Sequence, residues 1–153
     1  MSRHGASTLR VLIATDGSAD AQKAVAWVAS LPPQASVELR ALSVATLPRG
    51  PLDVPQVHEY HQSFLDEARR AAEAARATLE LRWSNAEARV VEGDPREEIV
   101  RAAAEWPADL IVGGARGLGA LARLFLGSVS EHVAHHASCS VLIVREVTGR
   151  SGA

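Results

Sequence analysis

The sequence predicts a single α/β domain with an open five-stranded parallel β-sheet and helices on both faces. Five short apolar segments alternate with four segments whose apolar residues recur at helical spacing. Strands and helices that alternate in this way form parallel sheets covered on both sides. No internal repeat or low-complexity linker divides the 153 residues, so one domain is expected.

The first part of the chain supplies two strands and a helix. Leu9–Ala14 is an apolar run that ends in the turn sequence Thr15-Asp16-Gly17-Ser18. Helical spacing continues from Ala19 to Leu31, and the proline pair that follows stops the helix. Val37–Val44 alternates and then becomes apolar, which predicts the second strand.

The middle of the chain supplies a long helix and the third strand. Ala45–Pro55 is rich in proline and is predicted to be a loop. A long amphipathic helix follows. Its apolar face is predicted to contain Val57, Tyr60, Phe64, Ala68, Ala71, Ala75 and Leu79. Ala86–Val91 is the third strand.

The last part of the chain supplies two helices and two strands. Asp94 and Pro95 are a favourable helix start, and this helix should end near Trp106, before Pro107. The remaining elements are a strand over 109–112, a helix over 128–136 and a strand over 140–145. We expect the domain to cover residues 8–147, with flexible termini at 1–7 and 148–153.

Composition excludes several classes of protein. A formal charge of −2 provides no basic surface for sequence-independent binding of nucleic acid, so no nucleic-acid partner is expected. No run approaches the ~18 apolar residues of a membrane helix, and the N-terminus lacks the apolar core of a signal peptide. The single cysteine, Cys139, excludes an internal disulfide framework. We therefore expect a cytoplasmic protein without a membrane partner.

The most unusual stretch runs from Val112 to Val129 and holds five of the eleven glycines. It follows the apolar run 109–112, so a buried strand leads into a glycine-rich turn and then into a helix. Free amides and the helix dipole make such an arrangement suitable for binding phosphate. Arg116 and Arg123 add positive charge beside the glycines.

A loop without a ligand is the alternative explanation of this stretch. Ser128 and Glu131 have the spacing of a capping box, which would satisfy the helix amides internally. A P-loop is excluded because that motif ends in Gly-Lys-Ser/Thr and the only lysine is Lys23. The dinucleotide fingerprint is absent from the first strand–helix turn. The residues alone leave anion binding and a ligand-free loop both open.

Three residues of interest end three predicted strands: Asp16, Val44 and Gly114. Ligands of open parallel sheets bind outside the carboxyl ends of the strands, where the winding reverses. Asp16 can cap the first helix together with Ser18, or it can bond ribose hydroxyls or hold a metal near phosphates. These two roles are compatible.

Histidines cluster on two of the predicted helices. His132, His135 and His136 share one side of the last helix, and His58 and His61 lie on the long one. A spacing of three or four residues can place two imidazoles on one metal ion. No cysteine or acidic partner completes a recognisable zinc pattern, so histidines without a metal are the favoured interpretation.

These motifs together resemble the universal stress proteins, specifically the single-domain branch that binds ATP. The nucleotide motif of that branch is matched at every position by Gly114-x2-Gly117-x9-Gly127-Ser128. The likeness extends from about Arg10 to Arg145 and includes the Thr15-Asp16 turn. It implies a Rossmann-like sheet with strand order 3-2-1-4-5.

The resemblance implies that the first two strands contribute to an ATP site. Asp16 would contact the ribose or the phosphates with their bound Mg or Mn, and Thr15 would line the same cleft. The main chain of Val44 would hydrogen-bond the adenine edge. A phosphate contact from Arg116 is our own inference, because relatives vary at that position.

The resemblance also assigns roles to the glycine stretch. Gly114 and Gly117 would let the chain approach the ribose and phosphates. Gly127, Ser128 and the amide of Val129 would hold the phosphate tail, which is the role that the helix-terminus argument gives them independently.

The implied strand order places the last strand, 140–145, at an edge of the sheet. Val141–Val144 is apolar on both faces and carries no charge or proline that would block pairing with another chain. Pairing with the same strand of a second copy would cover this edge. We therefore expect a homodimer, which is also the usual state of the family.

Three functions remain open at this point. The first is an ATP-binding regulatory protein of a stress response, acting on an unknown protein partner as a nucleotide-loaded homodimer. The second is a slow ATP hydrolase that uses a metal held by Asp16 as a timer. No dedicated base is present beyond Glu131, so no catalytic residue is assigned. The third is an interaction module that binds no nucleotide.

Overall fold

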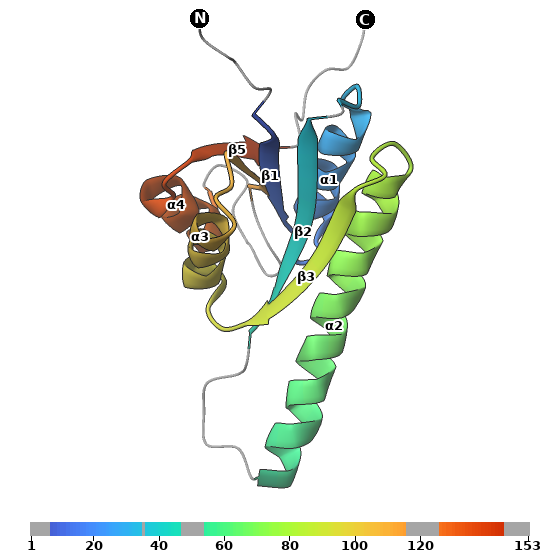
Figure 1. Ribbon diagram of the computed structural model, residues 1–153. Helices are drawn as coiled ribbons and strands as arrows, with labels where there is room; N and C mark the ends of the chain where they lie inside the picture. Colours follow the sequence, from blue (N-terminus) through green and yellow to red (C-terminus); the bar gives the residue numbers. More distant parts are fainter. Residues whose placement is uncertain (1–6, 35, 47–53, 116–125, 146–153) are drawn as a thin grey trace, which may run out of the picture.

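The computed structural model describes residues 7–34, 36–46, 54–115 and 126–145 (Figure 1). Its five strands are β1 (Leu9–Ala14), β2 (Val37–Ala45), β3 (Ala86–Glu92), β4 (Leu110–Gly114) and β5 (Ser140–Val144). Its four helices are α1 (Ala19–Ser30), α2 (Val54–Glu80), α3 (Pro95–Glu105) and α4 (Ser128–His136). The predicted order of elements is therefore confirmed for the described part of the chain.

The five strands form one parallel sheet with the order β3-β2-β1-β4-β5, as expected. Four predicted strand ends are wrong by one or two residues. β2 and β3 each continue one residue further than predicted, to Ala45 and Glu92. β4 continues through the two glycines that follow Val112, because Gly113 and Gly114 pair in register with Ile143 and Val144 of β5. β5 ends one residue before Arg145.

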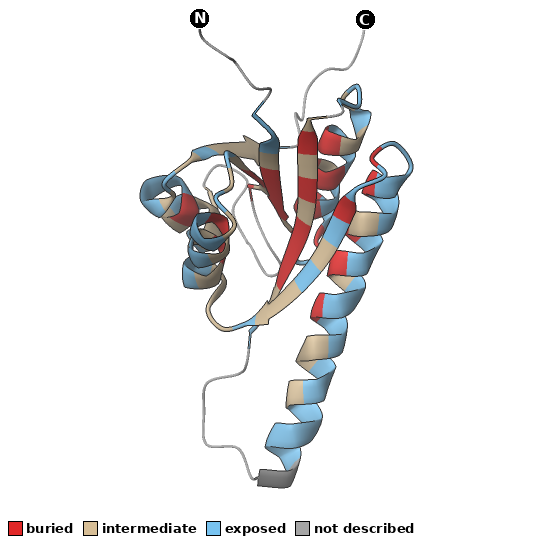
Figure 2. Ribbon diagram, viewed as in Figure 1, coloured by how far each residue is buried: buried red, intermediate tan, exposed pale blue. Residues whose placement is uncertain are grey.

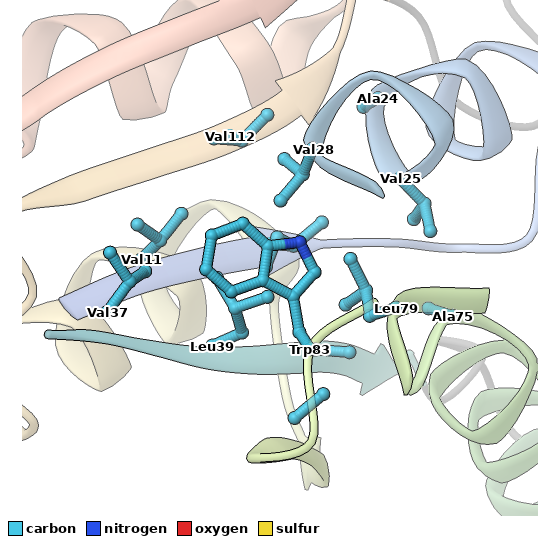
Figure 3. Close-up of a cluster of buried hydrophobic side chains, with 13 residues drawn as sticks. Val11, Ala24, Val25, Val28, Val37, Leu39, Ala75, Leu79, Trp83 and Val112 are labelled. Atoms are coloured by element: carbon cyan, nitrogen blue, oxygen red, sulfur yellow. The ribbon is translucent and has the colours of Figure 1, made fainter. Parts of the chain in front are cut away.

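Helices cover both faces of the sheet, and each face has its own core (Figures 1 and 2). On one face, α1 and α2 pack against alternate residues of the central strands (Figure 3). This core includes Val11, Ile13, Val28, Leu39, Leu79, Trp83 and Val112. On the other face, α3 and α4 cover Leu12, Leu42 and Ile111 through Ile99, Ala103 and Val133. Alternation along each strand thus sends neighbouring side chains into two different cores.

Helix α2 is longer than the sheet that it covers. Its 27 residues span about 40 Å at 1.5 Å per residue, whereas the nine residues of β2 span about 30 Å. The N-terminal turns of α2 therefore extend beyond the sheet (Figure 1), and Val57 and Tyr60 are exposed. Of the predicted apolar face, Ala68, Ala75 and Leu79 are buried against the sheet, whereas its N-terminal part has no sheet beneath it.

Helix boundaries follow local chemistry. The side chain of Asp94 accepts a hydrogen bond from the amide of Arg96, and Pro95 occupies the first position of α3, as predicted. The prediction that Pro55 belongs to the loop after β2 is wrong, because Pro55 is the second residue of α2, where a missing N–H is tolerated. No helix in the described part of the chain is long and apolar enough to cross a membrane.

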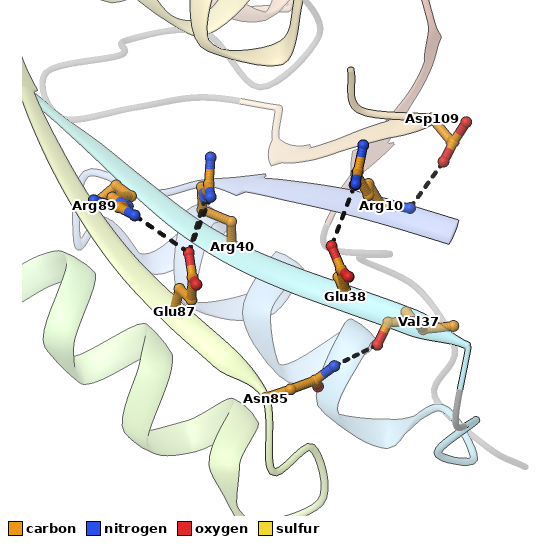
Figure 4. Close-up of polar contacts among 8 residues, drawn as sticks. All are labelled: Arg10, Val37, Glu38, Arg40, Asn85, Glu87, Arg89 and Asp109. Carbon is orange, nitrogen blue, oxygen red and sulfur yellow. Dashed lines mark hydrogen bonds and ion pairs between the residues drawn. The ribbon is translucent and has the colours of Figure 1, made fainter. Parts of the chain in front are cut away.

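Ion pairs join neighbouring strands of the sheet (Figure 4). Nε of Arg10 lies 3.2 Å from Oε2 of Glu38, which links β1 to β2. Arg40 on β2 lies 3.0 Å from Oε2 of Glu87 on β3, and its guanidinium also stacks on Trp106 at 4.2 Å. β3 is thus an edge strand with charged side chains, unlike β5 at the other edge.

Candidate functional site

A cavity of about 610 Å³ opens at the carboxyl ends of the strands. It receives residues from β1, β2, β4 and β5 and from helices α1 to α4. β1 and β4 are neighbours in the sheet although the chain winds outward from them in opposite directions. The cavity therefore lies at the switch point where ligands of this fold class bind, and its volume is within the range of ligand pockets.

The structure brings most of the predicted site residues together at this cavity. Seven of them line it: Thr15, Asp16, Val44, Gly114, Gly127, Ser128 and Val129. The other two, Arg116 and Gly117, lie outside the described residues. Residues that are 114 positions apart in the chain are thus gathered around one cavity, although their contacts with a ligand remain a prediction.

The turn after β1 is held by side-chain oxygens. Oγ1 of Thr15 accepts a hydrogen bond from the amide of Gly17 at 3.2 Å, and Oδ1 of Asp16 accepts one from the amide of Ser18 at 2.9 Å. Gly17 has a φ of +79°, which glycine adopts without strain. The helix cap itself is Ser18, whose Oγ accepts from the amide of Ala21. Asp16 therefore shapes the turn and stands exposed at the cavity, while Ser18 caps α1.

The main chain of Val44 faces the space beyond the end of β1. The carbonyl of Leu42 accepts from the amide of Thr15 on the β1 side, whereas the carbonyl of Ala45 accepts from Gly93 on the β3 side. Main-chain groups of alternate residues in a strand point to the same side, so Val44 shares the direction of Leu42. Because the chain turns away after Thr15, the N–H and C=O of Val44 are directed into the switch-point region.

The two glycines at the end of β4 differ in the space around them. A Cβ on Gly114 would lie 2.6 Å from the carbonyl carbon of Asp20 and 2.8 Å from the amide nitrogen of Ala21. This glycine therefore lets β4 pack closely against the first turn of α1. A Cβ on Gly113 would have no neighbour within 4 Å, and Gly113 also lines the cavity. The sequence analysis did not include Gly113 among the site residues. Strand alternation was the available signal, because it places Gly113 on the opposite face of the sheet from Gly114, away from α1.

The start of α4 differs from the predicted capping box. Gly127 is the N-cap and Ser128 is already the first helical residue, so Ser128 cannot cap the helix with its side chain. The amide of Glu131 bonds to the carbonyl of Gly127, and among the described residues no side chain caps this helix start. The capping-box prediction is therefore wrong. The first-turn amides have no acceptor within the helix, and Ser128, Val129 and Ser130 line the cavity.

Two hydrogen bonds fix the start of α4 to the end of β4, and a third joins the end of β4 to β5. The hydroxyl of Ser130 donates to the carbonyl of Gly114 at 2.7 Å. The amide of Gly127 donates to the carbonyl of Ala115 at 2.7 Å, and the amide of Ala115 donates to the carbonyl of Val144. Ala115 and Gly127 are thus bonded to each other directly.

Helices α2 and α3 supply cavity residues that the sequence did not reveal. Phe64, Glu67 and Ala68 come from α2, and Pro95 and Ile99 come from α3. Helical periodicity gives the buried face of each helix, but it does not show which turn meets the carboxyl ends of the strands. The helix start at Pro95 was a signal that could have revealed one of these residues, because it follows the carboxyl end of β3 directly.

The cavity has the chemistry of a site for an amphiphilic anion. Apolar side chains such as Leu42, Ile111 and Val133 form part of its wall. The uncapped helix start, the hydroxyls of Thr15 and Ser128 and the carboxylate of Asp16 provide polar groups at its mouth. A planar base against the apolar wall and a phosphate group at the helix start would both find suitable partners. The residues present therefore fit an adenine nucleotide.

Other reactive groups lie outside this cavity. In the part of the chain that the structure describes, no cluster of three or more His, Cys, Asp or Glu side chains is placed to hold a metal ion. Burial, assisted by the nearby Asp109 carboxylate, raises the pKa of the Cys139 thiol. A thiol that stays protonated is a poor nucleophile.

Comparison with known proteins agrees with this arrangement. Residues 8–145 match the Universal stress protein family. A universal stress protein of Thermus aquaticus is 39% identical over 137 residues, which cover 88% of this chain and 97% of that protein. The structure of universal stress protein UspA from Lactobacillus plantarum superimposes with a TM-score of 0.72 at 26% identity, covering 92% of this chain and 99% of that one.

A further solved structure is a universal stress protein in complex with cAMP. It is 29% identical, with a TM-score of 0.59, and the superposition covers 89% of this chain and 96% of that one. The match of residues 8–145, the strand order and these relatives lead to one conclusion. The chain belongs to the universal stress protein family.

Proposed function

We propose that this protein binds ATP, with Mg or Mn, and acts in a stress response as a nucleotide-loaded homodimer. The observation that carries the proposal is the convergence of three features on one cavity. These are the uncapped start of α4, the turn at Asp16 and the outward-facing main chain of Val44. Each feature matches a different part of a nucleotide.

The start of α4 is the proposed phosphate site. The first-turn amides of Ser128 and Val129 and the positive end of the helix dipole favour an anion here. Ser130 keeps this helix start at the end of β4 through its 2.7 Å bond to the carbonyl of Gly114. Gly113 leaves open space on the adjoining strand, so a ligand can approach the backbone.

The ends of β1 and β2 are the proposed nucleoside site. The main-chain N–H and C=O of Val44 offer one donor and one acceptor, the pair that the edge of adenine requires. The apolar wall, with Leu42 and Ile111, would contact the face of the base. Asp16 would bond the ribose hydroxyls or a metal on the phosphates, since oxygen ligands suit Mg. The cAMP complex of a relative supports an adenine nucleotide as the ligand class.

The homodimer is proposed to form through β5. The carbonyl of Val144 points to β4, where it accepts from Ala115, so the main-chain groups of Val141 and Ile143 point to the open edge. The side chains of residues 141–144 of β5 are apolar and half-buried within one subunit. Antiparallel pairing of two such edges about a two-fold axis would satisfy these groups and cover the apolar side chains.

Calorimetric titration of nucleotide-stripped protein with ATP, AMP, cAMP and GTP, each with and without Mg, tests the nucleotide proposal. We expect micromolar binding of ATP, strengthened by Mg, and clearly weaker binding of GTP. Equal binding of all four nucleotides would contradict an adenine-specific site. No binding of any nucleotide would overturn the proposal and leave a ligand-free interaction module.

A further inference from the structure

Helix α2 crosses the carboxyl ends of β3, β2 and β1. In its first half, Nε2 of His61 lies 3.0 Å from Oε1 of Glu92, the last residue of β3. About three turns later, Ala71 packs beside the turn that follows β1, since a Cβ on Gly17 would lie 3.6 Å from the Cβ of Ala71. β2 lies between β3 and β1 in the sheet. Residues 64–68 of α2 therefore pass over the end of β2.

Two large side chains of this span, Phe64 and Glu67, line the cavity together with Val44 at the end of β2. Phe64 is half-buried, whereas Glu67 is exposed. Glu67 lies three residues after Phe64 and four before Ala71, so these residues share one side of the helix. The proposed phosphate site at the start of α4 adjoins β4, on the other side of β1. Glu67 is thus at the nucleoside end of the cavity.

Acidic side chains near Glu67 on α2 are paired with arginines. Asp66 pairs with Arg69 at 3.3 Å, and Glu73 pairs with Arg76 at 2.8 Å. Among the described residues, the side chain of Glu67 takes part in no ion pair or hydrogen bond. An ionised carboxylate accepts hydrogen bonds and donates none, so Glu67 offers an acceptor to a ligand in the cavity.

From this placement we propose that Glu67 determines the specificity for adenine by accepting a hydrogen bond from the 6-amino group of the base. This role rests on the proposed nucleotide function, to which it adds a side chain. The 6-amino group of adenine carries two hydrogens, and the carbonyl of Val44 would accept only one of them. An acceptor on α2, which passes over the end of β2, would take the second. Phe64, one turn before Glu67, would contact the base beside it.

The same carboxylate would disfavour a base with an oxygen at this position. Inosine nucleotides carry a 6-oxo group, and two acceptors that face each other form no hydrogen bond. Covering the carboxylate with such a base would leave both oxygens without a partner, which costs more than a missing contact. Attraction to one ligand is thus combined with repulsion of another. Glu67 should therefore add to the discrimination that the main chain of Val44 provides.

Calorimetric titration of wild type and Glu67→Gln with ATP, ITP and 2′-deoxy-ATP tests this role. The side-chain amide of glutamine can donate to the 6-oxo group, which a carboxylate cannot do. The ratio of the dissociation constant of ITP to that of ATP should therefore fall at least about fivefold in Glu67→Gln. Ratios are compared because loss of a negative charge near the phosphates should strengthen the binding of every nucleotide.

Glu59→Gln is the matched control for the loss of charge. Glu59 is an exposed carboxylate on α2 that does not line the described part of the cavity. Its ratio of ITP to ATP dissociation constants should stay within about twofold of wild type. The ratio of the 2′-deoxy-ATP and ATP constants should be the same in Glu67→Gln and wild type, because the ribose is not the partner of Glu67.

Each contrary result has a separate meaning. If Glu67→Gln changes the 2′-deoxy-ATP ratio and leaves the ITP ratio as in wild type, Glu67 contacts the ribose and its role at the base is overturned. If wild type binds ATP and the preference over ITP is absent, or is kept in Glu67→Gln, the role of Glu67 is overturned and the proposed nucleotide function stands. Wild-type protein that binds no nucleotide would overturn both.

Discussion

The hydroxyl of Ser130 donates a hydrogen bond to the main-chain carbonyl of Gly114 at 2.7 Å, which joins the first turn of α4 to the last residue of β4. Two elements that flank the glycine stretch are therefore connected directly. The bond orients the uncapped helix start relative to the sheet. It is a structural prerequisite of the phosphate site proposed above.

Replacement of Ser130 should loosen this connection. Ser130→Ala removes the donor, and we expect the free energy of unfolding to fall by about 1 kcal/mol in urea denaturation. Ser130→Thr keeps a hydroxyl and should retain most of the stability and of the nucleotide affinity. Equal stability of Ser130→Ala and wild type would show that the bond does not hold α4.

Replacement by alanine should change stability at only one of the two glycines at the end of β4. In Gly114→Ala the new methyl group would meet the backbone of Asp20 at 2.6 Å, and overpacking of this kind lowers stability by roughly 1–3 kcal/mol. Gly113→Ala places its methyl group in open space, so its stability should stay within about 0.5 kcal/mol of wild type. Thermal unfolding of both variants measures the difference.

The affinity for ATP provides a second measurement on the Gly113→Ala variant. Gly113→Ala fills part of the cavity and should weaken ATP binding while the fold is intact. Undiminished ATP affinity in this variant would indicate that the nucleotide does not approach the end of β4 on that face.

The charge of Asp16 can be tested apart from its role in the turn. Asp16→Asn keeps an oxygen that can accept from the amide of Ser18, so stability should be unchanged. The variant loses the negative charge, and the gain in ATP affinity on adding Mg should disappear. Asp16→Ala should in addition lose about 1 kcal/mol of stability, because the acceptor of the Ser18 amide is removed. An unchanged effect of Mg in Asp16→Asn would exclude Asp16 as a metal ligand.

The proposed dimer depends on the outward main chain of β5. Ile143→Pro removes an N–H that points to the open edge and leaves the hydrogen bonds to β4 in place. We expect a monomer in analytical ultracentrifugation. Ile143→Val keeps this N–H and should remain dimeric. A dimeric Ile143→Pro variant would place the interface elsewhere.

The Cys139 thiol should react slowly at neutral pH. Burial and the Asp109 carboxylate raise its pKa, and only the thiolate is alkylated efficiently. The rate of alkylation by iodoacetamide should therefore rise with a midpoint above the value of about 8.5 for a free thiol. A midpoint below that value would mean that the environment stabilises the thiolate.

Much of the fold could be predicted from the sequence because its signals are local. Apolar runs such as Leu9–Ala14 and helix starts such as Asp94-Pro95 fix the type of each element. The end of β4 could not be predicted, since glycine has a low strand propensity and pairing with β5 overrides it. The overhang of α2, with Tyr60 exposed, depends on the length of the sheet beneath it.

The candidate site was predictable where the chain ends a strand or begins a helix. Asp16, Val44 and Ser128 were found in this way, and they line one cavity. Side chains such as Glu67 reach the cavity only through the packing of a helix across the sheet, which periodicity does not specify. The capping box at Ser128 was a false signal, because the helix begins one residue earlier than that motif requires.

The most direct test of the central claim is calorimetric titration of ATP with Mg into wild type and Gly127→Val. Gly127 has φ −63° and ψ 157°, an extended conformation that valine also adopts, so its backbone should tolerate the change. The branched side chain would occupy the proposed phosphate path at the start of α4. We predict micromolar binding by wild type and loss of binding by the variant, with unchanged circular dichroism. Equal affinity of the two proteins would contradict phosphate binding at the start of α4.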